Sequence, residues 1–436
     1  MKHPYLLMLE DTQTRLPFGH VVGVNGPAIE ASGPIGAIGD ICVIESQNTE
    51  AVAYAKIVAA NRDGISLMTL EDRLRPRPGD RVTASTFGAS LRKGSGFAGR
   101  AIDALGRPID GGLPVTGTER SALPSASMLR RRGPVQMIET GIRAIDGLLT
   151  LGEGQRIGVF AASGVGKTSL IDQIIRQVHA DRIVVCLVGE RGREVSGLWD
   201  AADQDRERLT LVASTSDESA VMRVRAVEQA LAIACHWRAC GEHVLFVIDS
   251  VTRYAMALRE VGLAAGAPPT IRAYTPNVFA ALPELVERCG AIDGEGAITA
   301  VMTVLSETDD VDDPIVEIMK SLLDGHIILS RRLADKRHFP AIDVVRSVSR
   351  QAERLMDSGQ AGDARDAMEV LATYEENRVL IESGLYRAGA SQQIDHSLRV
   401  RDGLMKFLAQ PSAERCSLAA TRKQLTAALQ RGGSRV

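Results

Sequence analysis

No stretch of about 18 consecutive apolar residues occurs in this sequence, so nothing in it has the length and hydropathy of a membrane-spanning helix. The first residues, Met-Lys-His-Pro-Tyr, also lack the apolar core of a secretory signal. The formal net charge is only −3, which argues against the broad basic surface that binds nucleic acid. We therefore expect a cytoplasmic protein with no nucleic-acid partner, in which the cluster Arg130-Arg131-Arg132 is a solvated linker or a contact on the phosphate side.

The six cysteines also lack a metal-binding pattern. They lie at positions 42, 186, 235, 240, 289 and 416, with neither C-x-x-C spacing nor a histidine arrangement suited to zinc. Reduced and mostly buried thiols are expected.

What the sequence does contain is enough apolar material for large cores. Its 436 residues are 45% hydrophobic, which predicts two or three domains. From Gly19 to Thr86, short apolar runs alternate with turn residues, and this spacing predicts a small β-barrel within residues 1–90. The runs are His20–Asn25, Ala28–Ser32, Ile41–Glu45, Val52–Val58 and Gly64–Leu70.

A different pattern extends from about Ile142 to Ser349. Apolar runs typical of buried strands alternate with helix-period segments such as Lys167–His179 and Ser219–Trp237. This alternation predicts an α/β domain with a parallel sheet that binds ligands at the carboxyl ends of its strands. The predicted strands are Arg156–Phe160, Ile183–Val188, Val244–Ile248, Ala297–Leu305 and Gly325–Leu329.

The segments before and after this α/β pattern predict where the central domain begins and ends. Gly88–Met137 is rich in glycine, proline and serine, and is interpreted as a linker with turns wrapped on the next domain. After Arg350 the strand signals end and the chain becomes charged and helical. We therefore expect a central domain over residues 91–350, including that linker, and an α-helical domain over residues 351–436.

The most informative motif is A-A-S-G-V-G-K-T-S-L, which follows the strand Arg156–Phe160 and begins a helix near Lys167. Small residues allow backbone N–H groups to surround phosphates, Lys167 reaches the β- and γ-phosphates, and Thr168 offers a hydroxyl to Mg²⁺. The strict form of this loop has glycine where the sequence has Ala161. The predicted nucleotide contacts are Ala162, Ser163, Gly164, Val165, Gly166, Lys167, Thr168 and Ser169.

Charged residues suited to binding Mg²⁺ or to acting on phosphate follow two further predicted strands. The run Val244–Asp249 ends in a carboxylate, where an aspartate would support the Mg²⁺ shell. Glu190 and Arg191 follow the strand Ile183–Val188, where Glu190 would polarise an attacking water and Arg191 would face the γ-phosphate. A surface cluster of ion pairs is the alternative interpretation of this second pair.

Several stretches resemble the ATP synthase α/β subunit family. Pro340–Arg350 is similar to its P-A-I-D-x-x-x-S-x-S signature, and Gly99–Asp110 matches its G-R-x-x-D-x-x-G-x-P-I-D element. Within that family, Thr140–Thr150, Gly189–Val195 and Ser321–Ile327 resemble the ATPase of type III protein export. The resemblance covers about residues 19–410 and implies a RecA-like central domain. Ala161 is compatible with it, because export ATPases commonly lack that glycine.

The resemblance also implies roles for individual residues. It makes Glu190 the catalytic carboxylate, Arg191 a phosphate sensor and Arg253 a further arginine on the phosphate side. Phe339 corresponds to an aromatic residue that stacks on adenine, with a core phenylalanine as the alternative.

Arg350 corresponds to an arginine finger, which acts on a neighbouring subunit's nucleotide. ATP synthase divides the finger and the catalytic carboxylate between two types of subunit, whereas this chain contains both. The resemblance therefore implies a ring of identical subunits, a homohexamer. ATP and Mg²⁺ are the expected ligands.

Three functions are compatible with these features. The first is a homohexameric ATPase that energises chaperone release and substrate unfolding at a type III export gate, at the cytoplasmic face of the inner membrane. Its implied partners are stalk and stator proteins, the export gate and chaperone–substrate complexes. The second is a subunit of a rotary ATP synthase, but no acidic lever sequence like D-E-L-S-E-E-D follows Arg350. The third is a hexameric RNA translocase, for which residues 20–86 offer only Tyr54 as an aromatic platform.

Overall fold

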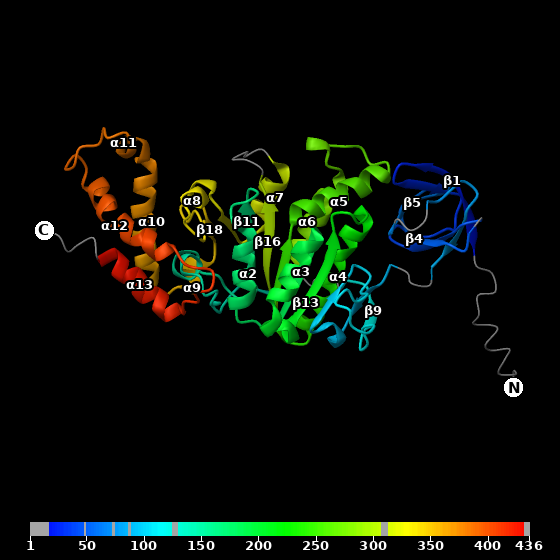
Figure 1. Ribbon diagram of the computed structural model, residues 1–436, viewed down its shortest axis with the longest axis horizontal. Coiled ribbons are helices and arrows are strands. Elements are labelled where there is room, and N and C mark those ends of the chain that lie inside the picture. Colours follow the sequence, from blue (N-terminus) through cyan, green and yellow to red (C-terminus); the bar gives the residue numbers. More distant parts are fainter. Residues whose placement is uncertain are drawn as a thin grey trace.

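The structure, a computed structural model of the chain, describes residues 17–47, 49–71, 75–85, 89–123, 130–306 and 313–430. Three parts follow one another along its longest axis (Figure 1). A β-barrel lies at one end, a sheet flanked by helices lies in the middle, and a group of helices lies at the other end. Within the described residues, no helix combines the length and the hydropathy needed to cross a bilayer.

The first part is a closed barrel, as the sequence predicts. Its strands are β1 (Phe18–Asn25), β2 (Ala28–Ala31), β3 (Ile41–Glu45), β4 (Val52–Ala60), β5 (Ile65–Thr69) and β6 (Arg81–Ala84). They pair in the order β1-β2-β5-β4-β3-β6, and β6 closes the barrel against β1. Alternate residues such as Ile44, Leu67 and Val82 fill its interior. The sixth strand, β6, is not among the predicted runs, because Val82 is its one buried residue and the apolar signal is therefore weak.

The central part is the predicted parallel sheet. Its main strand order is β18-β17-β11-β16-β14-β12-β13-β8. The strands are β8 (Arg100–Ile102), β11 (Arg156–Ala161), β12 (Arg182–Glu190), β13 (Leu209–Thr215), β14 (His243–Asp249), β16 (Ala297–Leu305), β17 (Gly325–Ile328) and β18 (Val348–Ser349). Only the β17–β18 pair in this order is antiparallel.

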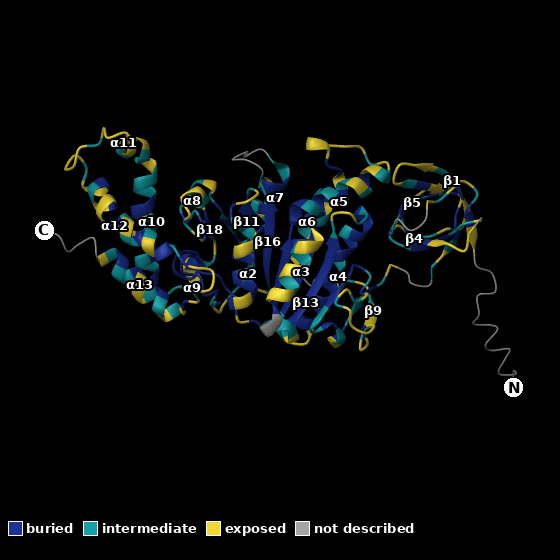
Figure 2. Ribbon diagram, viewed as in Figure 1, coloured by how far each residue is buried: buried dark blue, intermediate teal, exposed yellow. Residues whose placement is uncertain are grey.

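Helices cover this sheet, so that its strands are almost wholly buried (Figure 2). The α-helices of this part are α2 (Lys167–Gln177), α3 (Gly192–Ala201), α4 (Ala220–Ala239), α5 (Val251–Ala264), α6 (Pro276–Arg288), α7 (Pro314–Leu322) and the one-turn α8 (Arg331–Asp335). Shorter turns are η1 (Ser95–Phe97), η3 (Ile145–Leu149), η4 (Asp203–Arg208) and η5 (Ile271–Ala273). Apolar strands buried on both faces are typical of parallel sheets, which explains why their sequence runs were recognisable.

The stretch 88–137 is more than the linker that its composition indicates. Within it, β8 joins the edge of the central sheet parallel to β13, and β7 (Leu91–Lys93) pairs with β9 (Glu119–Ser121). Further along, β10 (Arg131–Arg132) pairs with β15 (Gly290–Ile292). Two or three residues of strand produce no periodicity, so the linker interpretation was wrong about these segments.

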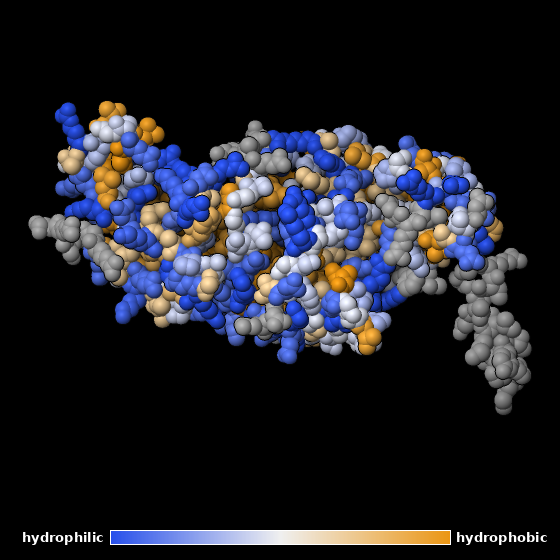
Figure 3. All heavy atoms as spheres, in the orientation of Figure 1, coloured by the Kyte–Doolittle hydropathy of each residue, from blue (hydrophilic) through white to orange (hydrophobic). Residues whose placement is uncertain are grey.

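The last part is helical through Gln430, as predicted. Its helices are α9 (Ala352–Leu355), α10 (Ser358–Glu376), α11 (Arg378–Glu382), α12 (Gln392–Leu408) and α13 (Leu418–Gln430). Asp357 caps α10 by accepting the backbone N–H of Gln360 at 2.9 Å. Apolar side chains gather at the α11 end of this part (Figure 3), where Val379 and Leu385 are 76% and 73% exposed.

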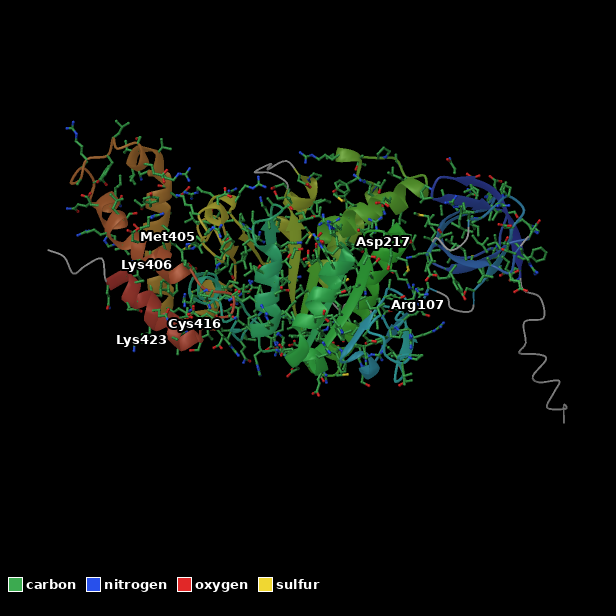
Figure 4. The ribbon with its side chains drawn as sticks, viewed as in Figure 1. Arg107, Asp217, Met405, Lys406, Cys416 and Lys423 are labelled. Atoms are coloured by element: carbon green, nitrogen blue, oxygen red, sulfur yellow. The ribbon has the colours of Figure 1, made fainter. Side chains whose placement is uncertain are left out.

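Polar contacts join the barrel to the central part. Arg107 and Asp217, labelled in Figure 4, lie on the side of the central part that faces the barrel. Arg107 forms ion pairs with Asp103, at 2.6 Å, and with Glu71, two residues after the end of β5, at 2.5 Å. Ser219 donates its hydroxyl to the carbonyl of Leu70 at 2.9 Å.

A buried arginine joins the helical part to the central part. Arg143 donates to the backbone carbonyls of Phe407, at 2.7 Å, and Ala409, at 2.5 Å, and pairs with Glu414. Its own backbone N–H donates to Gln410 at 2.8 Å. Because this guanidinium is only 6% exposed, removing it would leave several buried acceptors without a donor.

We expect Arg143→Met to destabilise the docking of the C-terminal helices by on the order of 3 kcal/mol, because it breaks a buried charged pair and its hydrogen bonds. Thermal unfolding followed by calorimetry measures the change. Arg415→Ala is the matched control, since Arg415 pairs with Glu139 at 3.1 Å but is half exposed, and it should cost about 1 kcal/mol or less. Equal small losses in both variants would contradict a special role for Arg143.

Candidate functional site

The phosphate loop lies between the carboxyl end of β11 and the first turn of α2. Gly164 and Gly166 have φ angles of +79° and +97°, which L side chains rarely adopt, so glycine is required at both positions. Ala161 is the last residue of β11 and pairs with Leu305 of β16. A strand backbone accepts alanine as well as glycine, which explains why the departure from the strict loop pattern is tolerated at this position.

A cavity of about 440 Å³ opens above this loop. Of the predicted contacts, its walls include Ala162, Ser163, Gly164, Gly166, Lys167, Thr168, Ser169, Glu190, Arg191 and Arg253. Val165 does not line it, because its side chain is 2% exposed and packs in the hydrophobic core. Any contact of Val165 with phosphate would therefore come from its backbone.

Lys167 stands between two carboxylates that come from neighbouring strand ends. Its ammonium donates a hydrogen bond to Asp249 at the end of β14, and lies 3.8 Å from Oε1 of Glu190 at the end of β12. Thr303 of β16 donates its hydroxyl to the same Asp249 oxygen at 2.8 Å. These contacts fix the Asp249 carboxylate beside the phosphate loop.

Glu190 is the other carboxylate of the cavity and is 6% exposed. Burial, followed by repulsion from Asp249, raises its pKa, whereas Lys167 and Arg253 act in the opposite direction. The Arg253 guanidinium donates to Oε1 of Glu190 at 3.2 Å. A carboxylate whose proton affinity is raised in this way is suited to accept a proton from water.

Phe339 lies beside the loop rather than in the core. A Cβ at Gly166 would be 3.4 Å from its ring, and the side chain is 44% exposed. This exposure removes the alternative of a core phenylalanine. The carbonyl of Phe339 accepts the backbone N–H of Gln410 at 2.8 Å, so the C-terminal part contacts the segment beside the loop.

Arg350 is the one predicted site residue that the fold places far from this cavity. Its backbone N–H donates to the carbonyl of Asp324 at 3.0 Å. The backbone N–H of Asp324 in turn donates to the carbonyl of Arg156 at 2.8 Å. Arg156 begins β11, whereas the phosphate loop follows the other end of that strand. Six strand residues separate those ends by roughly 17 Å, farther than an arginine side chain extends.

Sequence reasoning missed four residues of the site. Glu194, Leu305 and Ser306 line the cavity, and Thr303 orients Asp249. Leu305 ends the predicted strand Ala297–Leu305 and Ser306 follows it, so the rule that ligands bind at the carboxyl ends of parallel strands could have identified both. The contact of Thr303 depends on strand neighbours that the sequence does not specify.

The donor chemistry of the site fits Mg²⁺. Thr168 and Asp249 provide a hydroxyl and a carboxylate, the hard oxygen ligands that this ion prefers, and Mg²⁺ sites commonly use one or two protein ligands together with phosphates and waters. Among the described residues, no group of three or more His, Cys, Asp or Glu side chains is placed to hold a metal ion.

A sheet of this topology with a phosphate loop and two carboxylates at its carboxyl edge defines a nucleoside-triphosphate hydrolase. Comparison with known proteins gives the same class. Residues 141–349 match the nucleotide-binding domain of the ATP synthase alpha/beta family, and residues 356–427 match the C-terminal domain of the type III secretion ATPase EscN.

Individual proteins agree over nearly the whole chain. The flagellum-specific ATP synthase of Bacillus subtilis (strain 168) is 42% identical over 93% of this chain and 94% of its own length. The assembled ATPase EscN from the type III secretion system of enteropathogenic E. coli has a TM-score of 0.88 and 36% identity, over 94% of this chain and 100% of its own. EscN in complex with its central stalk EscO has a TM-score of 0.83 and 35% identity, over the same shares.

This chain therefore belongs to the ATPases of type III protein export, a branch of the ATP synthase alpha/beta family. The match of its C-terminal helices to that branch distinguishes it from rotary synthase subunits and from an RNA translocase.

The position of Arg253 leads to a prediction about pH. Arg253 favours the ionised form of Glu190, so Arg253→Gln should raise the pKa of Glu190 further. Since only the ionised carboxylate accepts a proton, the acid limb of the kcat/KM profile for ATP hydrolysis should move to higher pH. Arg191→Gln is the control, because it should lower the plateau without moving the limb. An unmoved limb in Arg253→Gln would contradict the pairing.

Proposed function

We infer that this chain hydrolyses ATP to energise protein export through a type III apparatus, in a flagellum or an injectisome. The observation that carries this function is the single cavity shared by the phosphate loop, Glu190 and Arg253. It occurs in a chain that aligns with a flagellum-specific ATP synthase over 93% of its length.

We assign the steps of hydrolysis to residues by their chemistry. Backbone N–H groups of the phosphate loop surround the β- and γ-phosphates, and Lys167 donates to them in place of Asp249. Glu190 orients the attacking water and accepts its proton. Arg191 and Arg253 face the negative charge that develops on the transferred phosphoryl group. Phe339 stacks on the adenine ring.

Thr168 and Asp249 would hold Mg²⁺ beside the phosphates. When bound, the ion neutralises charge on the β- and γ-phosphate oxygens.

We further propose that the chain acts as a homohexamer in which Arg350 completes a neighbour's site. Arg350 is exposed and lies at the edge of the sheet opposite its own phosphate loop, which supports action on another subunit. An arginine supplied from a neighbour stabilises the transition state in other nucleotide hydrolases.

The proposed partners are a stalk protein, stator proteins, the export gate and chaperone–substrate complexes. The stalk is supported by the structure of EscN with its central stalk EscO. The exposed apolar residues around α11, Val379 and Leu385 among them, offer a surface for contacts of this kind. In this role the protein would lie at the cytoplasmic face of the inner membrane.

Glu190→Gln should keep ATP binding and lose turnover, because it removes the base and leaves the phosphate loop intact. Lys167→Ala should lose turnover as well, since it removes the cation that faces the transferred phosphate. Losses of about 10²–10³ are expected for contacts of this kind. Phosphate release and binding of a fluorescent ATP analogue measure the two effects. Turnover within about threefold of wild type in Glu190→Gln would contradict its assignment.

Mixing two inactive variants tests whether Arg350 acts on the nucleotide of a neighbouring subunit. Arg350→Ala should bind ATP without turning it over, and Glu190→Gln retains a normal finger. In mixed rings, some nucleotide sites have an intact Glu190 from an Arg350→Ala chain and an intact Arg350 from a neighbouring Glu190→Gln chain. These sites contain every required group, so partial activity should return. A mixture that stays inactive, in rings shown by native mass spectrometry to contain both chains, would rule out action between subunits.

A further inference from the structure

We propose that Asp324 is a positioning residue for Arg350, and that its ion pair with Arg156 holds the finger in the orientation that reaches the neighbouring subunit. This inference rests on the proposed function of Arg350. Neither Asp324 nor Arg156 touches the cavity that would bind ATP in this chain.

The Arg156–Asp324 pair has the geometry of a strong, directional interaction. The Arg156 guanidinium donates from Nε to Oδ2 at 3.0 Å and from Nη2 to Oδ1 at 3.1 Å. The backbone N–H of Arg156 donates to Oδ2 at 2.9 Å, and the N–H of Asp324 returns a bond to the Arg156 carbonyl at 2.8 Å. Both side chains are about one-fifth exposed, at 21% and 17%. A two-pronged pair with backbone bonds on both sides fixes position as well as distance.

Asp324 in turn holds Arg350 through the backbone. Its carbonyl accepts the N–H of Arg350 at 3.0 Å, and the next residue, Gly325, pairs with Ser349 in the antiparallel β17–β18 ladder. The approach is so close that a Cβ on Gly325 would lie 2.3 Å from the carbonyl oxygen of Val348.

The Arg350 side chain points back to the same segment. Its Nη2 donates to the carbonyl of Lys320, in the last turn of α7, at 3.1 Å. Asp324 lies two residues after the end of α7, so the backbone and the side chain of Arg350 are both anchored to the stretch that Asp324 connects to β11.

β18 has only two residues, and the Ser349 hydroxyl, which accepts a hydrogen bond from Gln155 at 3.0 Å and donates to the carbonyl of Thr150 at 2.9 Å, holds it only on the side before Arg350. So short a strand at the edge of a sheet is held by few ladder bonds. A finger displaced by about 1 Å can lose about 10² in rate, so a small rotation of β18 suffices to impair it. The Arg156–Asp324 pair supplies an anchor from β11, the strand that carries the chain's own phosphate loop at its other end.

Asp324→Asn keeps the shape of the side chain and removes its charge. We expect it to bind the fluorescent ATP analogue like wild type and to lose at least about tenfold in turnover. Glu287→Gln is the matched control, because Glu287 is the outer partner of Arg156, at 3.2 Å, and is half exposed. That control should hydrolyse ATP at the wild-type rate. Wild-type turnover in Asp324→Asn would overturn the proposal.

Mixed rings separate an effect on the finger from a defect in the chain's own site. If Asp324 acts through Arg350, then Asp324→Asn mixed with Glu190→Gln should recover activity to within about twofold of the Arg350→Ala and Glu190→Gln mixture. Asp324→Asn mixed with Arg350→Ala should stay inactive, since both chains lack a working finger. The opposite pattern would assign Asp324 to its own nucleotide site and overturn the proposal.

Two further outcomes are decided in the same experiment. If Asp324→Asn fails to fold, Arg156→Lys replaces it in the same mixtures, because lysine keeps the charge and loses the two-pronged contact. If the reference mixture of Arg350→Ala and Glu190→Gln stays inactive, the finger itself is misassigned and the role of Asp324 falls with it. If the reference mixture is active but the Asp324→Asn mixtures do not show the expected activities, only the role of Asp324 is overturned.

Discussion

The parallel register of β11, β16, β14 and β12 is the constraint on which the rest of the molecule depends. Register pairs Leu187 of β12 with Asp249 of β14, and Ala161 of β11 with Leu305 of β16, so all four strands end at one edge. Lys167, Glu190 and Asp249 follow or occupy those ends, and they meet although up to 82 residues separate them in the sequence. Opposite charges in a partly buried cavity then hold each other in place, which prepares the site for a more highly charged ligand.

The two ends of β11 give the subunit two different faces. One end continues into the phosphate loop, and the other binds Asp324 and through it the segment that carries Arg350. The six residues of β11 are the whole connection between these two faces. In a ring of such subunits, each β11 would lie between the nucleotide of its own chain and that of a neighbour.

The barrel and the C-terminal helices contact the central part through polar groups at defined points. Arg107, paired with Glu71 and Asp103, lies on the barrel side, and Arg143 binds the C-terminal carbonyls on the other. Gln410, which contacts both Arg143 and the carbonyl of Phe339, places the helical part within one hydrogen bond of the segment beside the phosphate loop.

The sequence by itself determined the features that depend on local pattern. Apolar runs identified five strands of the central sheet but missed the buried β13, whose run Leu209–Thr215 is interrupted by threonine and serine. Glycine, lysine and threonine identified the phosphate loop, and helical periodicity identified the C-terminal part. Strands of two or three residues, such as β8 and β18, were not predicted because so few residues show no periodicity. Only the tertiary structure decided that Thr303 orients Asp249, that Phe339 is exposed beside Gly166, and that Asp324 links Arg156 to Arg350. Those contacts join residues from separate elements, and which elements become neighbours is set by sheet order and packing rather than by any local sequence signal.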